Sequence, residues 1–399
     1  MEEEDGEKDF LWAKENMRLI EKIIHQYNDE KVLDGYRLGI CLHITKETSV
    51  LLMGLKKLGA EIFLCSANPL STQNHIASFL KEKGIHVYGK KGESTKSYYQ
   101  NMESVLLNEP HLIIDDGGEL HKRAFNKNFK VIGGTEETTT GINRLAAWQK
   151  INLIKYPVIA VNHSKTKYLF DNRYGTGQSS MEGILRTTGV LFAGKRVVVC
   201  GYGWVGKGVS SFARGLGAKV IVTEVNPIRA LEAFMDGFEV KPISKTIQLG
   251  DIYITCTGQK NVIRKEHIEK MNDGTILANA GHFDAEIDIR YLKIIDKNYK
   301  KIQPNMDCYR IKNKKIYLLA EGRVINLVGG KGHPPEIMAL SFANQMLSII
   351  FLIQNYKRLE KKIYKVPPSI QKRISEMALK SFDIEIDKIT KEQKKYFYT

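Results

Sequence analysis

Three polar clusters follow directly after short apolar runs that predict β-strands: His43-Ile44-Thr45, Asp115-Asp116 and Asn162-His163. Imidazole and carboxylate groups can take up and release protons, the imidazole near neutral pH. Lys167 and Asp171 lie four residues apart, on one side of a helical turn if their segment is helical. These residue types suit acid–base chemistry. Taken singly, each also has a structural explanation, as a buried histidine, a turn or a surface ion pair.

The segment Gly201-Tyr-Gly203-Trp-Val205-Gly206 has the glycine spacing of a dinucleotide-binding turn. It follows one predicted strand, opens a predicted helix and is followed by a second strand that ends at Glu224. The three glycines permit a tight turn, a close approach of pyrophosphate to the backbone, and close packing of helix on strand. Glu224 can accept hydrogen bonds from both ribose hydroxyls and would repel a 2′-phosphate. The predicted cofactor is therefore NAD; Arg229 is the one feature that favours NADP.

Alternating strand and helix patterns predict an α/β fold with parallel sheets, whose ligands bind beyond the carboxyl ends of the strands. The predicted strands cover 36–42, 61–65, 85–88, 111–114, 158–161, 196–200, 219–223, 251–255, 275–278 and 323–326. The predicted helices cover 45–58, 76–83, 143–154, 207–216 and 337–353.

The order of these elements predicts two doubly wound parallel-sheet domains, with a Rossmann NAD domain inserted into a discontinuous substrate domain. We expect a substrate-binding domain over 1–178, the NAD-binding domain over 179–332, the return of the substrate domain with a hinge helix over 333–358, and a short C-terminal helical segment over 359–399. The chain passes between the two domains near 175–190 and again near 330–340, and these two connections predict hinges on either side of a cleft.

The composition is that of an ordinary globular protein: 399 residues, 43% hydrophobic, 26% charged, with a formal net charge of +15. The basic residues are spread along the chain without a recognisable nucleic-acid module, so we expect no nucleic-acid partner. The apolar segment 337–353 is interrupted by Ser341, Asn344, Gln345 and Ser348 and predicts a core helix, so we expect no membrane partner. The acidic N-terminus and five scattered cysteines indicate a reducing cytoplasm.

In this order, the motifs make the chain resemble the S-adenosyl-L-homocysteine hydrolase family, from about Gly35 to beyond His333. The segments that carry the resemblance are Cys41–Thr48, Asp115–Gly118, Glu136–Gly141, Thr166–Asn172, the glycine turn, Gly281–Asp288 and Gly332–Pro334. The resemblance implies a thioether hydrolase that reversibly converts S-adenosyl-L-homocysteine to adenosine and L-homocysteine. In this family the 3′-hydroxyl is oxidised to a ketone by tightly bound NAD, which is regenerated in each turnover. The reaction removes the product inhibitor of methyltransferases.

The resemblance also implies residue roles. Lys167 and Asp171 would bind the 3′-hydroxyl, with Lys167 taking its proton after burial lowers the lysine pKa. Asp116 would remove the C4′ proton, and His43 would protonate the leaving thiolate and activate water. The remaining implied catalytic residues are Glu137, Asn172 and His282. The implied substrate contacts are Thr45, Glu47, Asn162 and His333. The implied cofactor contacts are Thr138, Thr139, Thr140, Asn172, Gly201, Gly203, Val205, Gly206, Glu224, Arg229, Thr257, Gly281 and Asn326.

The chain departs from the family pattern at a few places. Thr176 replaces a common cysteine, His163 replaces an acid, and Lys331 replaces a methionine in the hinge loop. The family's C-terminal lysine and tyrosine, which reach a neighbouring subunit's NAD, have no evident match in Lys394–Thr399. The resemblance implies a homotetramer built as a dimer of dimers. It predicts no metal ion.

Three alternatives stay open. S-inosyl-L-homocysteine could replace the adenosyl substrate, although Glu47 would attract the amino group of adenine and repel the oxo group of hypoxanthine. A catalytically silent regulatory paralogue would keep the fold for partner binding. A simple dehydrogenase would release NADH into the medium.

Overall fold

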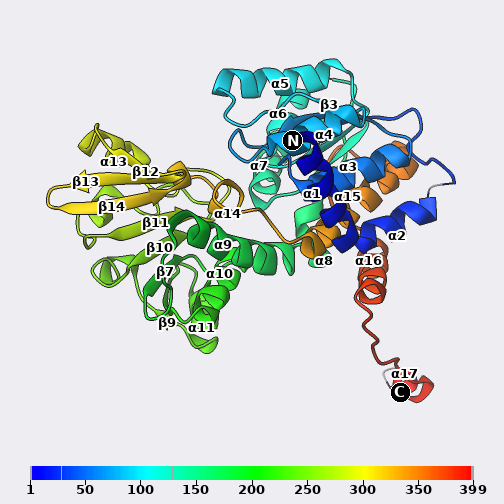
Figure 1. The fold of residues 1–399 in the computed structure, drawn as a ribbon. Helices are drawn as coiled ribbons and strands as arrows, with labels where there is room; N and C mark the ends of the chain where they lie inside the picture. The colour runs from blue at the N-terminus through cyan, green and yellow to red at the C-terminus, as the bar shows by residue number, and fades with distance from the viewer. Residues whose placement is uncertain (1, 28, 128, 397–399) are drawn as a thin grey trace.

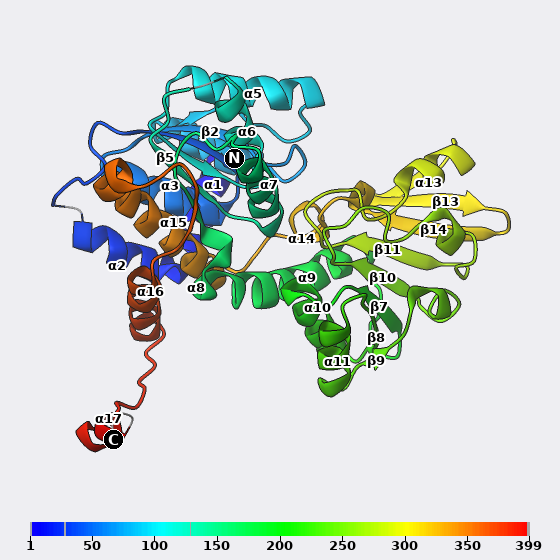
Figure 2. The ribbon, with the colours of Figure 1, turned by 180° about the vertical axis from the view of Figure 1, so that it is seen from behind.

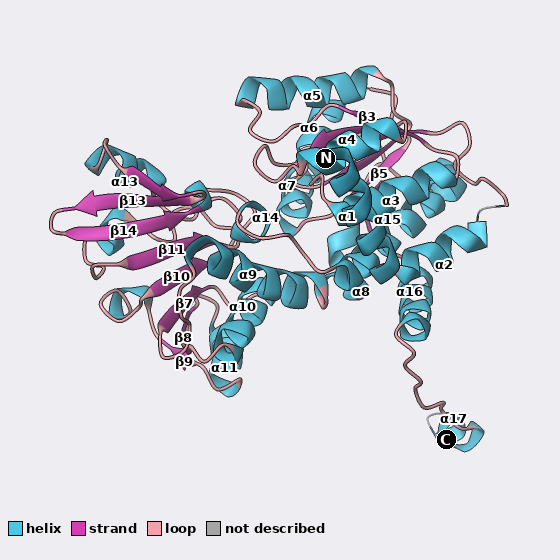
Figure 3. Cartoon of the chain, in the orientation of Figure 1, coloured by secondary structure: helices cyan, strands magenta, loops and turns pink. Residues whose placement is uncertain are grey.

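The computed structural model describes residues 2–27, 29–127 and 129–396, which form two α/β units connected by two crossings of the chain (Figure 1). Figure 2 shows the same two units from behind, and Figure 3 shows the sheet at the centre of each unit, flanked by helices. The fold is therefore of the predicted α/β class, with a Rossmann-like second unit.

The first unit contains seven parallel strands in the order β15-β6-β5-β4-β1-β2-β3. Their bounds are β1 (Arg37–Leu42), β2 (Glu61–Ser66), β3 (His86–Val87), β4 (Leu112–Asp115), β5 (Gly133–Glu136), β6 (Val158–Ala160) and β15 (Ile363–Lys365). One apolar cluster joins the sheet to α1 (Glu2–Asn16), α2 (Arg18–Tyr27), α3 (Lys46–Lys57), α4 (Asn74–Glu82), α15 (Pro335–Asn355) and α16 (Pro368–Ser381). A second joins it to α5 (Thr95–Leu107), α6 (Glu119–Asn126) and α7 (Thr139–Lys150).

The second unit contains an eight-stranded sheet in the order β12-β13-β14-β11-β10-β7-β8-β9. Its parallel strands are β7 (Arg196–Cys200), β8 (Lys219–Thr223), β9 (Glu239–Val240), β10 (Ile252–Thr255), β11 (Thr275–Asn279) and β14 (Lys314–Leu319). Strand β13 (Met306–Ile311) runs antiparallel to its neighbours β14 and β12 (Lys300–Gln303). One apolar cluster includes α9 (Thr176–Thr188), α10 (Trp204–Gly215), α11 (Pro227–Met235) and α14 (Ile325–Val328); another includes α12 (Lys265–Ile268) and α13 (Ile289–Ile295).

Two errors in the predicted strands have clear causes. The predicted strand over 323–326 is wrong: only Val324 makes an isolated bridge, to Asn279, because β14 already occupies the place beside β11. The prediction also missed β5, β9, β12, β13, β14 and β15; β5 was missed because its glycines have low strand propensity. A Cβ on Gly134 would lie 2.5 Å from the His121 ring, so glycine there allows the ring to approach the strand.

Two helices begin earlier in the structure than predicted. Helix α7 starts after Thr138, whose hydroxyl accepts from Gly141 N at 3.0 Å, and α10 starts after Gly203. The division into domain ranges stays a prediction. Strand β15 nevertheless extends the first sheet past residue 358, and α16 packs in the same apolar cluster as α15 and α2.

Helix α15 is the most apolar long helix in the described part of the chain. By length and composition, Pro335–Arg358 could cross a membrane, but 72% of its most apolar window is buried inside the protein. Its buried residues join the main apolar cluster of the first unit, as predicted for a core helix. Polar side chains from the same helix bond to residues that line the cavity described next.

Candidate active site

A cavity of about 1320 Å³ lies between the two units and extends from α3 to the glycine turn. Every predicted catalytic, substrate and cofactor residue lines it, except Gly206. A Cβ on Gly206 would lie 1.9 Å from the carbonyl oxygen of Gly201, so this glycine serves the close packing inside the turn instead. One cavity therefore brings together residues that are far apart in the sequence.

Lys167 is the centre of a buried polar network in the first unit. It lies on α8 (Lys165–Tyr168), where only 4% of its surface is exposed. Its Nζ is 3.3 Å from Asp171 Oδ2, 3.4 Å from Glu137 Oε1 and 3.0 Å from Asn172 Oδ1. Asn162 Oδ1 accepts from both Lys167 Nζ (3.2 Å) and Asn172 Nδ2 (3.1 Å). The predicted i,i+4 contact of Lys167 and Asp171 is thus present.

The charges in this network set the pKa values of its members. Burial alone would lower the pKa of Lys167, but the carboxylates of Asp171 and Glu137 outweigh burial and raise it. The predicted lowering of the lysine pKa is therefore wrong for the ligand-free protein. Burial raises the pKa of Glu137 to about 7, against the opposing effect of Lys167. Burial would also raise the pKa of Asp171, yet Lys167 and His333 hold it well below its usual range.

A second group of polar side chains lines the same cavity. His43 Nε2 is 3.6 Å from Asp116 Oδ2, and His282 Nδ1 is 3.7 Å from Asp116 Oδ1. His43 Nδ1 lies 2.6 Å from the Ser71 hydroxyl. Burial lowers the pKa of His43 to about 4 and also lowers that of His282, although Asp116 opposes both shifts. At neutral pH His43 is therefore a neutral imidazole, which can accept a proton or pass one on.

The glycine turn in the second unit fits a dinucleotide. Gly201 has φ 102°, and a Cβ on Gly203 would meet nothing nearer than Arg229 Nη1 at 3.8 Å, which leaves room at the backbone. Helix α10 has no side-chain cap, so its first N–H groups are free to bind phosphate oxygens. These features suit a pyrophosphate.

Glu224 suits the adenosine ribose of that dinucleotide. Its carboxylate accepts from the backbone N–H groups of Tyr202 (2.7 Å), Val225 (2.7 Å) and Asn226 (2.9 Å). Burial would raise the pKa of Glu224, but these bonds and Arg229 lower it, so the group is ionised at neutral pH. A 2′-phosphate would meet this negative charge. The geometry favours NAD over NADP.

The far end of the cavity, where the resemblance places the base, is formed by the start of α3. Thr45 caps this helix through Thr48 N at 3.4 Å, and Glu47 is 1% exposed. Glu47 Oε1 lies 2.7 Å from Lys46 Nζ. His333, which the resemblance places in the adenine-side loop at the hinge, is held by two polar contacts: its Nδ1 is 2.9 Å from Asp171 Oδ1 and its Nε2 is 2.9 Å from Asn326 Nδ2.

The threonines after Glu137 have a second role in the structure. Thr138 Oγ1 donates to Glu136 Oε1 at 2.8 Å and caps α7, and Asn162 Nδ2 donates to Thr139 Oγ1 at 2.7 Å. Both still line the cavity together with Thr140. The motif therefore starts a helix and also lines the cavity, while its contacts with the cofactor stay a prediction.

The comparisons with known proteins agree with this geometry. Residues 1–127 match the family model described as S-adenosyl-L-homocysteine hydrolase, and residues 172–332 match its NAD binding domain. The chain is 51% identical to an adenosylhomocysteinase of Sulfolobus acidocaldarius over 98% of this chain and 95% of that protein. It belongs to the S-adenosyl-L-homocysteine hydrolase family. The family's NAD-binding domain makes NAD the cofactor.

Relatives with two different names are nearly equally similar to this chain. An adenosylhomocysteinase of Aquifex aeolicus is 47% identical over 98% of this chain and 96% of its own. An S-inosyl-L-homocysteine hydrolase of Methanocaldococcus jannaschii is 50% identical over 98% of this chain and 95% of its own. Overall similarity within this hydrolase family therefore does not choose the nucleoside.

The structure adds residues to the hydrolase site that sequence reasoning missed. Ser341 donates to Asp171 Oδ2 at 2.6 Å, Gln345 donates to Glu137 Oε2, and both come from α15. Their signal was visible as polar interruptions of an apolar helix. In the second unit, Glu286 accepts from Thr257 N (2.9 Å) and Gly258 N (2.8 Å) and so fixes a cofactor-facing loop. No spacing rule marked Glu286.

Of the three departures from the family pattern, only Thr176 lines the cavity. Its hydroxyl is 3.3 Å from His333 Nε2 and 3.4 Å from the Asp171 carbonyl, at the start of α9. Threonine therefore takes part in the hinge network. Nothing in the structure explains His163 or Lys331.

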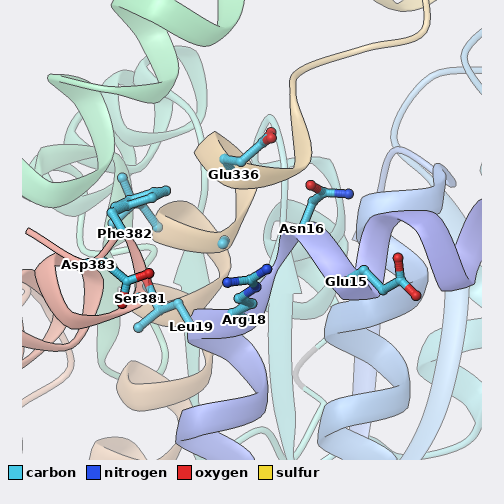
Figure 4. Close-up of a pocket in the computed structure, with 10 residues that line it drawn as sticks. Glu15, Asn16, Arg18, Leu19, Glu336, Ser381, Phe382 and Asp383 are labelled. Carbon is cyan, nitrogen blue, oxygen red and sulfur yellow. The ribbon is translucent and has the colours of Figure 1, made fainter.

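A second, smaller cavity of about 260 Å³ lies away from the hydrolase site, between the junction of α1 and α2, the start of α15 and the end of α16 (Figure 4). Glu15, Arg18, Glu336 and Asp383 contribute its charged groups. None of the predicted site residues lines it.

Proposed function

We propose that the protein hydrolyses S-adenosyl-L-homocysteine to adenosine and L-homocysteine, reversibly and with tightly bound NAD. The observation that carries this proposal is the single cavity in which Lys167, Asp171 and Glu137 face His43 and Asp116 beside a dinucleotide turn. A hydroxyl-binding network and a second acid–base pair are what a two-stage elimination and addition needs.

The residues divide the chemistry between the two groups. Bound NAD supplies a reversible oxidation at the 3′-carbon, which acidifies the neighbouring C4′ hydrogen. Lys167 and Asp171 hold the 3′-hydroxyl, and Glu137 and Asn172 hold the ribose. When the hydroxyl replaces one of the carboxylate contacts, the effect that raises the pKa of Lys167 weakens, so the amine can accept the hydroxyl proton.

The second group handles the thioether side. Asp116 takes the C4′ proton, and homocysteine leaves as its thiol with a proton relayed through His43. The neutral imidazole then accepts a proton from the incoming water, and Asp116 returns a proton to C4′. His282 packs on Gly117, where a Cβ would lie 2.8 Å from the ring, and screens this region from solvent.

For the nucleoside, we propose adenosine. Glu47 is buried at the edge of the cavity and offers carboxylate oxygens, which accept from an amino group and repel an oxo group. The Lys46 ammonium at 2.7 Å is the observation that favours the inosine alternative, since it is a donor. Turnover of the two thioethers should be compared on the same preparation; faster hydrolysis of S-inosyl-L-homocysteine would contradict the choice of adenosine.

The direct test of the reaction is homocysteine release by purified protein without added NAD. We expect equimolar adenosine and homocysteine, no NADH in the medium, and NAD among the molecules released on denaturation. NADH accumulation would indicate a simple dehydrogenase. Bound NAD with no turnover would indicate a silent paralogue.

We further propose a cytoplasmic homotetramer, a dimer of dimers, that removes the product inhibitor of methyltransferases and has no nucleic-acid or membrane partner. Support comes from an exposed apolar stripe on and beside α11, formed by Val225, Ile228, Leu231, Phe234 and Met235. The chain after α16 also leads away from the body to α17 (Lys391–Tyr396) and exposes Ile384, Ile386 and Ile389 (Figure 1). Light scattering tests this proposal; a stable monomer would contradict it.

A further inference from the structure

Each of two predicted catalytic acids is preceded by a second acid that does not line the cavity. Strand β4 ends with Asp115 followed by Asp116, and β5 ends with Glu136 followed by Glu137. Asp115 and Glu136 are register partners on adjacent parallel strands and are fully buried. Because successive side chains alternate at the end of a strand, the first acid of each pair points inward and the second into the cavity.

Glu136 connects the two catalytic loops through one oxygen atom. Its Oε1 accepts from Gly117 N at 2.9 Å, in the loop that follows Asp116. The same oxygen accepts from Thr138 N at 3.0 Å and Thr138 Oγ1 at 2.8 Å, in the loop that follows Glu137. Gly141 makes room for it, since a Cβ there would lie 2.1 Å from this oxygen.

Asp115, the partner of Glu136 on the adjacent strand, holds the same region through two further hydrogen bonds. Its Oδ1 accepts from Asp116 N and its Oδ2 from His121 N, each at 2.9 Å. The His121 ring is fixed in turn, 2.9 Å from the Tyr156 hydroxyl and 3.1 Å from the Thr135 carbonyl. The Asp115–Glu136 pair is therefore fixed to β4, β5 and α6 before any ligand binds.

What these contacts require of Glu136 is an acceptor oxygen rather than a negative charge. No cation is paired with it, and Oε2 is buried without a hydrogen-bond partner among the described residues. The titratable groups that act most strongly on the pair are Asp116, Glu119 and His121, and Arg144 bonds to the Gly117 carbonyl at 2.8 Å rather than to either acid. Burial raises the pKa of Asp115 to about 7 and that of Glu136 well above its ordinary value.

We propose that Glu136 is a positioning residue of the hydrolase reaction, whose Oε1 fixes the Asp116 and Glu137 loops relative to each other. This inference rests on the proposed function, because the positions of Asp116 and Glu137 matter only if they act on one substrate. Glu136 itself is fully buried and does not line the cavity.

Three variants of the holoenzyme separate the contributions of three properties of the Glu136 side chain: the position of its acceptor oxygen, its charge and its volume. Glu136→Gln keeps the acceptor oxygen and removes the charge, Glu136→Asp keeps the charge and retracts the oxygen, and Glu136→Met keeps the volume and removes the acceptor. We expect Gln to stay within about threefold of the wild-type kcat, Asp to lose about tenfold, and Met to lose about a hundredfold, because small misplacements of catalytic groups are costly.

Readouts other than rate exclude a merely structural effect. NAD content should be unchanged in all three variants, since the glycine turn lies in the other unit. KM for S-adenosyl-L-homocysteine should stay within about threefold, since α3 forms the base site independently. If the Glu136→Met variant does not fold, the kcat values of the Glu136→Gln and Glu136→Asp variants still decide whether Glu136 is a positioning residue.

The outcomes are distinct. A kcat order of Gln above Asp, with NAD content and KM kept, supports the positioning role. If the wild type has a normal rate and kcat of Glu136→Asp is equal to or above that of Glu136→Gln, the positioning role is overturned. The charge would then matter more than the position of the acceptor oxygen. Absence of thioether hydrolysis by the wild type overturns the proposed function, and the inference with it.

Discussion

The two sides of the cavity recognise their ligands in different ways. In the second unit, the glycine turn offers backbone N–H groups from one continuous segment, supported by the free N-terminus of α10. In the first unit, side chains from β1, β4, β5, α8 and α15 converge on Lys167 and Asp116, and many of them are separated by more than a hundred residues. Backbone recognition is local, whereas the catalytic network depends on the whole fold.

This difference has a physical consequence. The cofactor side is most sensitive to backbone space at the glycine turn, because a pyrophosphate must approach it, and its choice of NAD over NADP depends on the one carboxylate of Glu224. The substrate side tolerates little change in charge, because each buried charged group shifts the pKa values of its neighbours. Variants on the two sides should therefore fail differently.

The largest effect is expected for Lys167→Ala. The variant removes the buried ammonium that Asp171 and Glu137 share, so kcat should fall by about 10³–10⁴-fold. NAD should stay bound, as judged by nucleotide released on denaturation. Lys165→Ala, on the same helix with an exposed side chain, is the matched control and should keep its activity. A Lys167→Ala enzyme with near-normal kcat would remove Lys167 from the mechanism.

The next largest effect is expected for Gly206→Ala. The new Cβ would lie 1.9 Å from a backbone carbonyl that cannot move freely, so NAD content should fall by about tenfold or more and Tm by several degrees. Gly203→Ala has open space and should keep its Tm while binding NAD more weakly. Gly215→Ala, which meets nothing within 4 Å, should change neither quantity. Equal behaviour of the three variants would refute the glycine assignments.

A pH dependence is expected on the substrate side. Glu137 has a pKa of about 7 because of burial, and its carboxylate form is the one that accepts from Lys167 or the ribose. As pH falls below about 7, kcat/KM should therefore fall by about tenfold per unit. In Glu137→Gln, kcat/KM should be lower than in the wild type and should not change with pH over this range. Persistence of the acid limb in Glu137→Gln would assign it to another group, such as Asp115.

The same shift has an effect on stability with a fixed sign. A carboxyl whose pKa is higher in the folded than in the unfolded protein stabilises the fold at low pH and loses this contribution as pH rises through about 7. Tm of the wild type relative to Glu137→Gln should accordingly decrease from pH 5 to pH 8. An increase over that interval would contradict the raised pKa.

The smallest effect is expected for Glu47→Gln. A neutral amide can accept or donate a hydrogen bond, so the preference for the adenosyl over the inosyl thioether should shrink by about tenfold. The kcat for each thioether should stay above a few per cent of the wild-type value. The ratio of kcat/KM values for the two thioethers is the measurement. An unchanged ratio would show that Glu47 does not select the base.

The contrast between the two sides also explains what could be predicted from the sequence. The turn from Gly201 to Gly206 and the acid Glu224 follow local rules of spacing, and residues alone predicted their chemistry. His43, Asp116 and Lys167 are unremarkable in isolation, and only the family resemblance joined them. Ser341 and Gln345 were visible in the sequence as polar interruptions of an apolar helix, but spacing and periodicity could not assign the partners of these residues or of Glu136, because the contacts join different segments. The pKa of Lys167 was mispredicted because burial was considered without the two carboxylates beside it.

The central claim is that both sides of the cavity act on one substrate within a single turnover. Its most direct test is hydrolysis of S-adenosyl-L-homocysteine in D₂O without added NAD, with the adenosine product analysed by NMR. The account predicts deuterium at C4′, where Asp116 exchanges the proton, and retention of hydrogen at C3′, where the hydride returns from the bound cofactor. Adenosine with hydrogen retained at C4′, or NADH free in the medium, would contradict it.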